Sequence, residues 1–256
     1  MKATAKKIAA ITALALLALI LAVPSVAQEP VECEFDYTVQ SSDWLAKIAV
    51  QYYDDDALYP AIVRATNARA ESDDSYATIA DPWLIEPDWK LCIPSEQTAR
   101  SGFTVDALKN AEYQSEWTAS GTAPLTDGEY SESIVPGAAT KIFVLLSDRM
   151  AFGRFVDNQQ AAAVILITDP GGSGTFYYLA AVVEQEGELV NIATALLGDR
   201  VKIKSFAIVD EQIVLEMVTH GPDDPMCCPT QIVRRTYTFK DSELIEATSE
   251  VIGTVE

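Results

Sequence analysis

The chain has 256 residues and a formal net charge of −20 at pH 7, from 38 acidic and 18 basic side chains. Such an excess of negative charge excludes the basic surface that binds nucleic acid or an anionic membrane. The compatible partners are neutral or cationic.

The first 27 residues have the pattern of a secretory signal peptide. Lys2, Lys6 and Lys7 precede an apolar run over residues 8–23, and the segment ends in Ser25-Val26-Ala27, a typical cleavage pattern. The apolar run is shorter than the roughly 20 residues that span a bilayer, which argues against a retained anchor. Cleavage removes three lysines and no acidic residue, so the formal charge falls from −20 to −23. We therefore expect a secreted, extracellular or cell-envelope-associated protein.

The mature chain divides into two predicted folded parts. Residues 33–95 form a unit bracketed by two of the four cysteines, Cys33 and Cys92. The polar stretch 96–102 has no periodic apolar pattern and is expected to be a linker, and residues 103–256 form a second domain. In an exported chain, cysteines favour disulfides over metal sites, and four of them allow three pairings.

The first unit is expected to contain two strands and two helices. Residues 35–39 alternate and carry β-forming side chains, which predicts a strand. We expect Asp43 to cap a helix that runs to about residue 52, and a second helix to cover residues 58–67. A closing strand over residues 89–94 completes the order β-α-α-β.

Eight short segments of this unit resemble, in order, the pattern of a LysM domain. They are Tyr37-Thr38-Val39, Ser42-Asp43-Trp44-Leu45, Ile48-Ala49, Tyr52-Tyr53, Tyr59-Pro60-Ala61-Ile62 with Ala65-Thr66-Asn67, Asp81-Pro82-Trp83-Leu84-Ile85, and Leu91-Cys92-Ile93-Pro94. The resemblance covers residues 33–95 and implies binding of N-acetylglucosamine glycans, such as peptidoglycan or chitin. It also implies that the two strands pair antiparallel, so that Cys33 faces Cys92 and closes a loop worth about 4 kcal/mol.

The resemblance places the sugar between the loop after the first strand and the loop before the second. The expected glycan-binding residues are Ser42, Asp43, Trp44, Ile79, Ala80, Asp81, Pro82, Trp83, Leu84 and Ile85. Trp44 and Trp83 are the candidates for stacking on a sugar face. The chain departs from the family at Ser42, where a glycine is usual, at the bulky Trp44, at Asp81, where an asparagine is usual, and at Pro87-Asp88 in place of a glycine turn.

The second domain is expected to be mostly antiparallel β, which makes the whole chain α+β. Thr104 is expected to cap a short helix over residues 105–109. Runs rich in β-forming residues predict strands at 141–146, 163–168, 175–183, 189–195, 201–208, 213–219 and 232–239. The glycine run 171–174 lies between two of these runs and lacks the Lys-Ser/Thr of a phosphate loop, so we expect a hairpin turn.

One segment of this domain gathers chemically active side chains. Residues 220–229 contain the only histidine, His220, together with Asp223, Asp224, Cys227 and Cys228. A metal site or a Cys–His nucleophile uses these residue types. Three prolines restrict the segment, however, and we expect a structural loop in which the adjacent cysteines form a vicinal disulfide or remain two thiols.

Three stretches of the second domain, 172–179, 197–201 and 220–230, resemble an uncharacterised module of exported bacterial proteins and lipoproteins. No catalytic constellation, metal site or cofactor motif is predicted in the chain. The sequence therefore favours an exported carbohydrate-binding protein. The alternatives are a LysM-targeted cell-wall hydrolase and a scaffold protein with a degenerate LysM site that binds a cationic protein.

Overall fold

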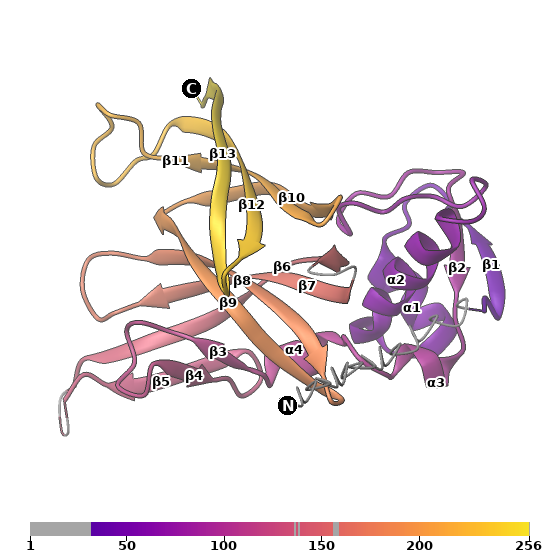
Figure 1. The fold of residues 1–256 in the computed structure, drawn as a ribbon, viewed down its shortest axis with the longest axis horizontal. Coiled ribbons are helices and arrows are strands. Elements are labelled where there is room, and N and C mark those ends of the chain that lie inside the picture. The colour runs from indigo at the N-terminus through magenta and orange to yellow at the C-terminus, as the bar shows by residue number, and fades with distance from the viewer. Residues whose placement is uncertain (1–31, 136, 138, 156–158, 256) are drawn as a thin grey trace, which may run out of the picture.

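The computed structural model describes residues 32–135, 137, 139–155 and 159–255 (Figure 1). The expected signal peptide lies outside these residues. The described chain contains helices and many antiparallel strands and is mostly β, with 48% strand and 15% helix. No described helix combines the length and the hydropathy needed to cross a bilayer.

The first unit holds two helices against a two-stranded sheet. Its elements are β1 (Phe35–Thr38), α1 (Leu45–Tyr53), the 3-10 helix η1 (Asp56–Leu58), α2 (Tyr59–Ala70) and β2 (Lys90–Ile93). β1 and β2 pair antiparallel, with Thr38 opposite Lys90. Cys33 and Cys92 form the expected disulfide, with their Cα atoms 5.2 Å apart.

Two details of this part differ from the sequence-based expectation. Asp43 does not cap α1, because the N-cap position is Trp44 and no side chain caps the helix. Residues 96–102, expected to be a linker, contain the short helix α3 (Glu96–Ala99), which is capped by the Ser95 side chain and buries Ala99. A four-residue helix has too few apolar positions to show periodicity.

The second unit consists of two main antiparallel meander sheets and a small two-stranded sheet (Figure 1). It opens with helix α4 (Val105–Lys109), capped by Thr104 as predicted, and with the small pair β3 (Glu112–Gln114) and β4 (Thr122–Pro124). The first main sheet has the order β5 (Glu129–Ser133), β6 (Lys141–Phe155), β7 (Gln159–Asp169), β8 (Phe176–Gln185) and β9 (Glu188–Asp199). The second has the order β10 (Lys202–Val209), β11 (Gln212–Thr219), β12 (Gln231–Lys240) and β13 (Glu243–Thr254).

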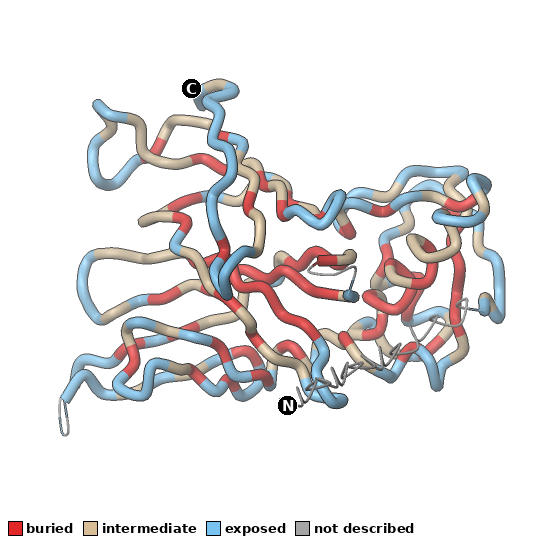
Figure 2. Tube along the Cα trace, in the orientation of Figure 1, coloured by how far each residue is buried: buried red, intermediate tan, exposed pale blue. Residues whose placement is uncertain are grey.

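The middle of the first main sheet, in β7 and β8, is buried on both faces. Residues 161–166 of β7 are each at most 1% exposed (Figure 2). The odd-numbered side chains of this run pack against the second sheet, and the even-numbered ones pack into the core that also holds the first unit. The continuous apolar run of β7 is therefore explained by burial on two sides, which removes the usual alternation of an antiparallel strand.

The two units share one hydrophobic core. Ile48 and Ile62 of the first unit belong to the same buried cluster as Phe152 and Val164 of the second. Between the units, the Arg64 guanidinium on α2 donates a hydrogen bond to the Phe103 carbonyl oxygen at 2.6 Å. The first unit is consequently fixed to the second, with α2 in contact with β6 (Figure 1).

Candidate functional site

The two loops predicted to hold a glycan leave the same end of the β1–β2 pair. After β1, the Val39 N–H donates to the Trp89 carbonyl oxygen, and the Asp88 N–H donates back to the Val39 carbonyl oxygen, both at 2.9 Å. Antiparallel pairing thus places the exit from β1 beside the entry to β2. The loop 40–44 begins at this position, and the loop 79–88 ends at it.

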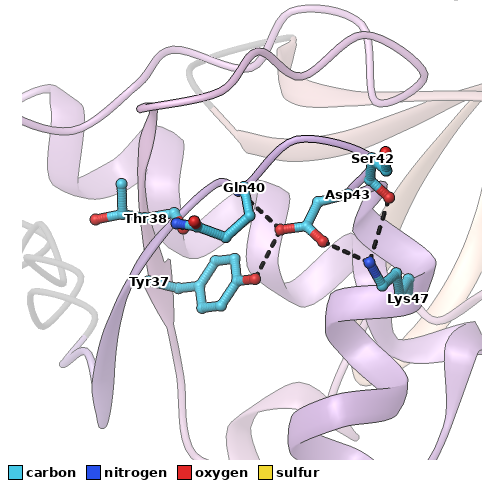
Figure 3. Close-up of polar contacts among 6 residues, drawn as sticks. All are labelled: Tyr37, Thr38, Gln40, Ser42, Asp43 and Lys47. Carbon is cyan, nitrogen blue, oxygen red and sulfur yellow. Dashed lines mark hydrogen bonds and ion pairs between the residues drawn. The ribbon is translucent and has the colours of Figure 1, made fainter.

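Asp43 organises the first loop through its carboxylate (Figure 3). The carboxylate accepts hydrogen bonds from the Tyr37 hydroxyl at 2.7 Å, from the Gln40 N–H at 2.8 Å and from the Lys47 ammonium at 2.8 Å. Burial by itself would raise the pKa of Asp43, but these three donors outweigh it and lower the pKa. The hydrogen bond to Asp43, together with burial, raises the pKa of Tyr37 to about 12. Asp43 is therefore a structural anchor of the loop.

Ser42 and Trp44 lie on either side of this anchor and both are exposed. Ser42 has a φ of 71°, in the left-handed region that favours glycine. Trp44 begins helix α1, and its side chain is 59% exposed. The Lys47 ammonium lies 5.4 Å from the Trp44 ring centroid, so the first loop presents a large aromatic surface to solvent.

The second loop is attached to α2 at Ile79. The Ile79 N–H donates to Asn67 Oδ1 at 2.7 Å, and Asn67 Nδ2 donates to the Ile79 carbonyl oxygen at 2.9 Å. The Ile79 side chain is fully buried. Ile79 therefore shapes the loop without offering its own backbone groups to a ligand.

The neighbouring Ala80 is exposed, and within the described chain its backbone N–H and carbonyl have no hydrogen-bond partner. Such groups are the kind that pair with the amide of an N-acetyl sugar.

A tight turn at Asp81 presents the end of the second loop. Asp81 Oδ1 accepts from the Trp83 N–H at 2.9 Å, and the Asp81 carbonyl oxygen accepts from the Leu84 N–H at 3.0 Å. Trp83 and Leu84 are 54% and 61% exposed, whereas Pro82 is buried. Ile85 is half-buried and packs against the core. The turn thus exposes the side chains of Trp83 and Leu84, while Pro82 and Ile85 hold the loop to the unit.

The second unit contributes to this loop through Arg149. Its guanidinium carbon lies 5.1 Å from the centroid of the Trp83 ring. Arg149 belongs to β6, in the other predicted domain, so no local sequence pattern connects it to Trp83. Asn67 was part of the LysM-like pattern, but the sequence did not assign its contact with Ile79.

The segment around His220 forms hydrogen bonds within itself. The Asp224 carboxylate accepts from the Gly221 N–H at 2.8 Å, the Thr230 N–H at 2.7 Å and the Thr230 hydroxyl at 2.8 Å. These backbone and side-chain hydrogen bonds lower the pKa of Asp224. Cys227 and Cys228 are joined in a disulfide. Their thiols are therefore not held as nucleophiles or metal ligands.

No family model matches the chain, and no curated protein or solved structure gives a significant match. Within the described part of the chain, no three His, Cys, Asp or Glu side chains cluster in a way that would hold a metal ion.

Proposed function

We propose that the first unit is a LysM-type module that binds N-acetylglucosamine-containing glycans, such as chitin or peptidoglycan, outside the cell. The observation that carries the proposal is the position of the two loops. They leave the same end of the β1–β2 pair. They expose Trp44, Trp83 and Leu84, together with the backbone groups of Ala80, which have no hydrogen-bond partner among the described residues. An N-acetyl sugar offers apolar ring faces and amide groups, which aromatic rings and backbone groups can meet.

The backbone supports the family assignment at two positions. The resemblance expects glycine at Ser42 and in the turn at Pro87-Asp88. Ser42 and Asp88 both have a φ of 71°, a conformation that glycine adopts without strain. The chain therefore keeps the backbone shape that the family pattern implies while it has replaced the residue type.

The charge of the protein favours an uncharged glycan over an anionic one. The formal charge of −20 for the whole chain disfavours long-range attraction to an anionic polymer. Binding should then depend on short-range contacts and change little with salt. A neutral glycan such as chitin fits this charge better than a strongly anionic wall.

The proposal is tested by calorimetric titration of the full mature chain with N-acetylglucosamine oligomers. Trp83→Ala and Trp44→Ala should each weaken binding by at least about fivefold, because truncation of a central aromatic contact costs roughly 1 kcal/mol or more. Phe35→Ala is the matched control, since Phe35 is an exposed aromatic residue on β1, outside both loops. Unchanged affinity in both tryptophan variants, or no binding by the wild type, would overturn the proposal.

A further inference from the structure

A cleft of about 480 Å³ lies at the junction of the two units. One wall comes from α2 and the second glycan loop, including Ile79 and Ala80. The opposite wall comes from Gly153 on β6, Gln160 on β7, Val209 at the end of β10 and the turn that follows it. Its volume falls within the roughly 300–1,000 Å³ of small-ligand pockets. The cleft therefore continues from the loop that carries the proposed sugar site.

The walls of this cleft are closely packed at the back. A Cβ atom added at Gly153 would lie 2.7 Å from the Cβ atom of Ile208, so only glycine allows β6 to approach β10 this closely. On the other wall, Asn67 holds Ile79 with two hydrogen bonds. A ligand would thus meet a preformed site, which lowers the ordering cost of binding.

The chemistry of the lining suits an uncharged ligand. Val209 and Ala80 supply exposed apolar surface, with the buried Phe152 and Ile208 behind them, and Gln160 supplies an amide. The Arg64 guanidinium already donates to the carbonyl oxygens of Ser101 and Phe103. Arg154 is 2.9 Å from the Glu71 carboxylate. The two cations of the cleft are therefore engaged with protein acceptors. The lining also contains the carboxylates of Glu71, Asp210 and Glu211, so it has no cationic excess for an anionic ligand.

We infer that this cleft is an additional saccharide subsite, in which the second unit binds further uncharged N-acetyl sugars of the glycan held by the first unit. This inference rests on the proposed glycan-binding function. Strand β6 links the two places, since it carries Arg149 against Trp83 and Gly153 in the cleft wall. At about 3.3 Å per residue, those two positions are separated by about 13 Å along the strand. The protein accordingly binds long oligomers more tightly than short ones.

The test is calorimetric titration of the full mature chain with N-acetylglucosamine oligomers of increasing length. Val209→Trp places a bulky side chain at the cleft, where Val209 is 43% exposed. We expect the wild type to bind the longest oligomers about tenfold more tightly than the shortest oligomer that it binds. Val209→Trp should remove this gain in affinity. It should leave the affinity for the shortest oligomer unchanged. The matched control is Val251→Trp, because Val251 is exposed on β13 and does not line the cleft.

Gln160→Ala provides a second variant that removes a polar contact without adding volume, and thermal unfolding checks that each variant is folded. Loss of the long-oligomer gain in Val209→Trp, with a smaller loss in Gln160→Ala, supports the subsite. If the wild type and both variants show the same increase in affinity with oligomer length, the subsite is overturned and the proposed function is unaffected. Absence of binding by the wild type at every length overturns both.

Discussion

At the scale of single residues, Asp43 was expected to cap a helix, but in the structure its side chain anchors the loop after β1. Its carboxylate is 4% exposed and receives three donors, two from side chains and one from the backbone. Each donor to a buried carboxylate is a charge-assisted hydrogen bond, which is stronger than a neutral one. The shape of the loop after β1 therefore depends on this single negative charge.

We predict that Asp43→Asn lowers the free energy of unfolding by about 1–3 kcal/mol at pH 7, because it weakens these hydrogen bonds. The folded-state pKa of Asp43 is lowered, so its stabilisation is present above the unfolded pKa of about 3.9 and is lost as pH falls through the folded value. Urea unfolding at several pH values should show the difference between wild type and variant shrinking below about pH 4. A difference that is constant down to pH 2 would contradict this role.

At the scale of elements, the first unit depends on the covalent link between its two strands. β1 and β2 are only four residues each, and a two-stranded sheet of this length is marginal without support. The disulfide between Cys33 and Cys92 spans 59 residues of chain and encloses α1, η1 and α2. The link therefore stabilises the elements that position both loops of the proposed glycan site.

Replacing this disulfide, as in Cys33→Ala with Cys92→Ala, should lower the free energy of unfolding by about 4 kcal/mol, the value expected for a loop of this length. Denaturant unfolding of the full chain measures the effect. The matched control is Cys227→Ala with Cys228→Ala, whose disulfide joins adjacent residues and encloses no loop. Equal effects of the two double variants would show that loop closure is not the source of stability.

At the scale of the whole molecule, the shared core couples the two units. Phe103 is 1% exposed in the segment that joins them. Its carbonyl oxygen accepts from Arg64, whose guanidinium carbon lies 5.9 Å from the Phe103 ring centroid. Burial of this side chain stabilises the contact of α2 with the second unit.

We predict that Phe103→Ala destabilises both units together, by about 3–5 kcal/mol, as for other buried aromatic residues cut to alanine. Hydrogen exchange should show protection falling in both α2 and β7. Phe35→Ala, at a half-exposed ring, is the control and should have a much smaller effect. Exchange that increases in α2 and stays unchanged in β7 would contradict a shared core.

Several elements were predictable because their signals are local. The seven predicted strands of the second unit correspond to β6 through β12, and the Thr104 cap and the hairpin turn between β7 and β8 were also predicted correctly. β13 was missed because, apart from Leu244, its side chains are not buried. Without a buried face, a strand has no alternation of apolar and polar residues. β3 and β4, at three residues each, are too short to show a pattern.

The sequence by itself determined the charge, the local strands and helices, and the candidate loops, because these depend on composition and on neighbours along the chain. Only the tertiary structure decided that Asp43 anchors a loop, that Arg149 lies against Trp83, and that one core and one cleft join the two units. Those contacts connect residues far apart in sequence. Their side chains meet only after the strands and helices have packed, so no local pattern specifies them.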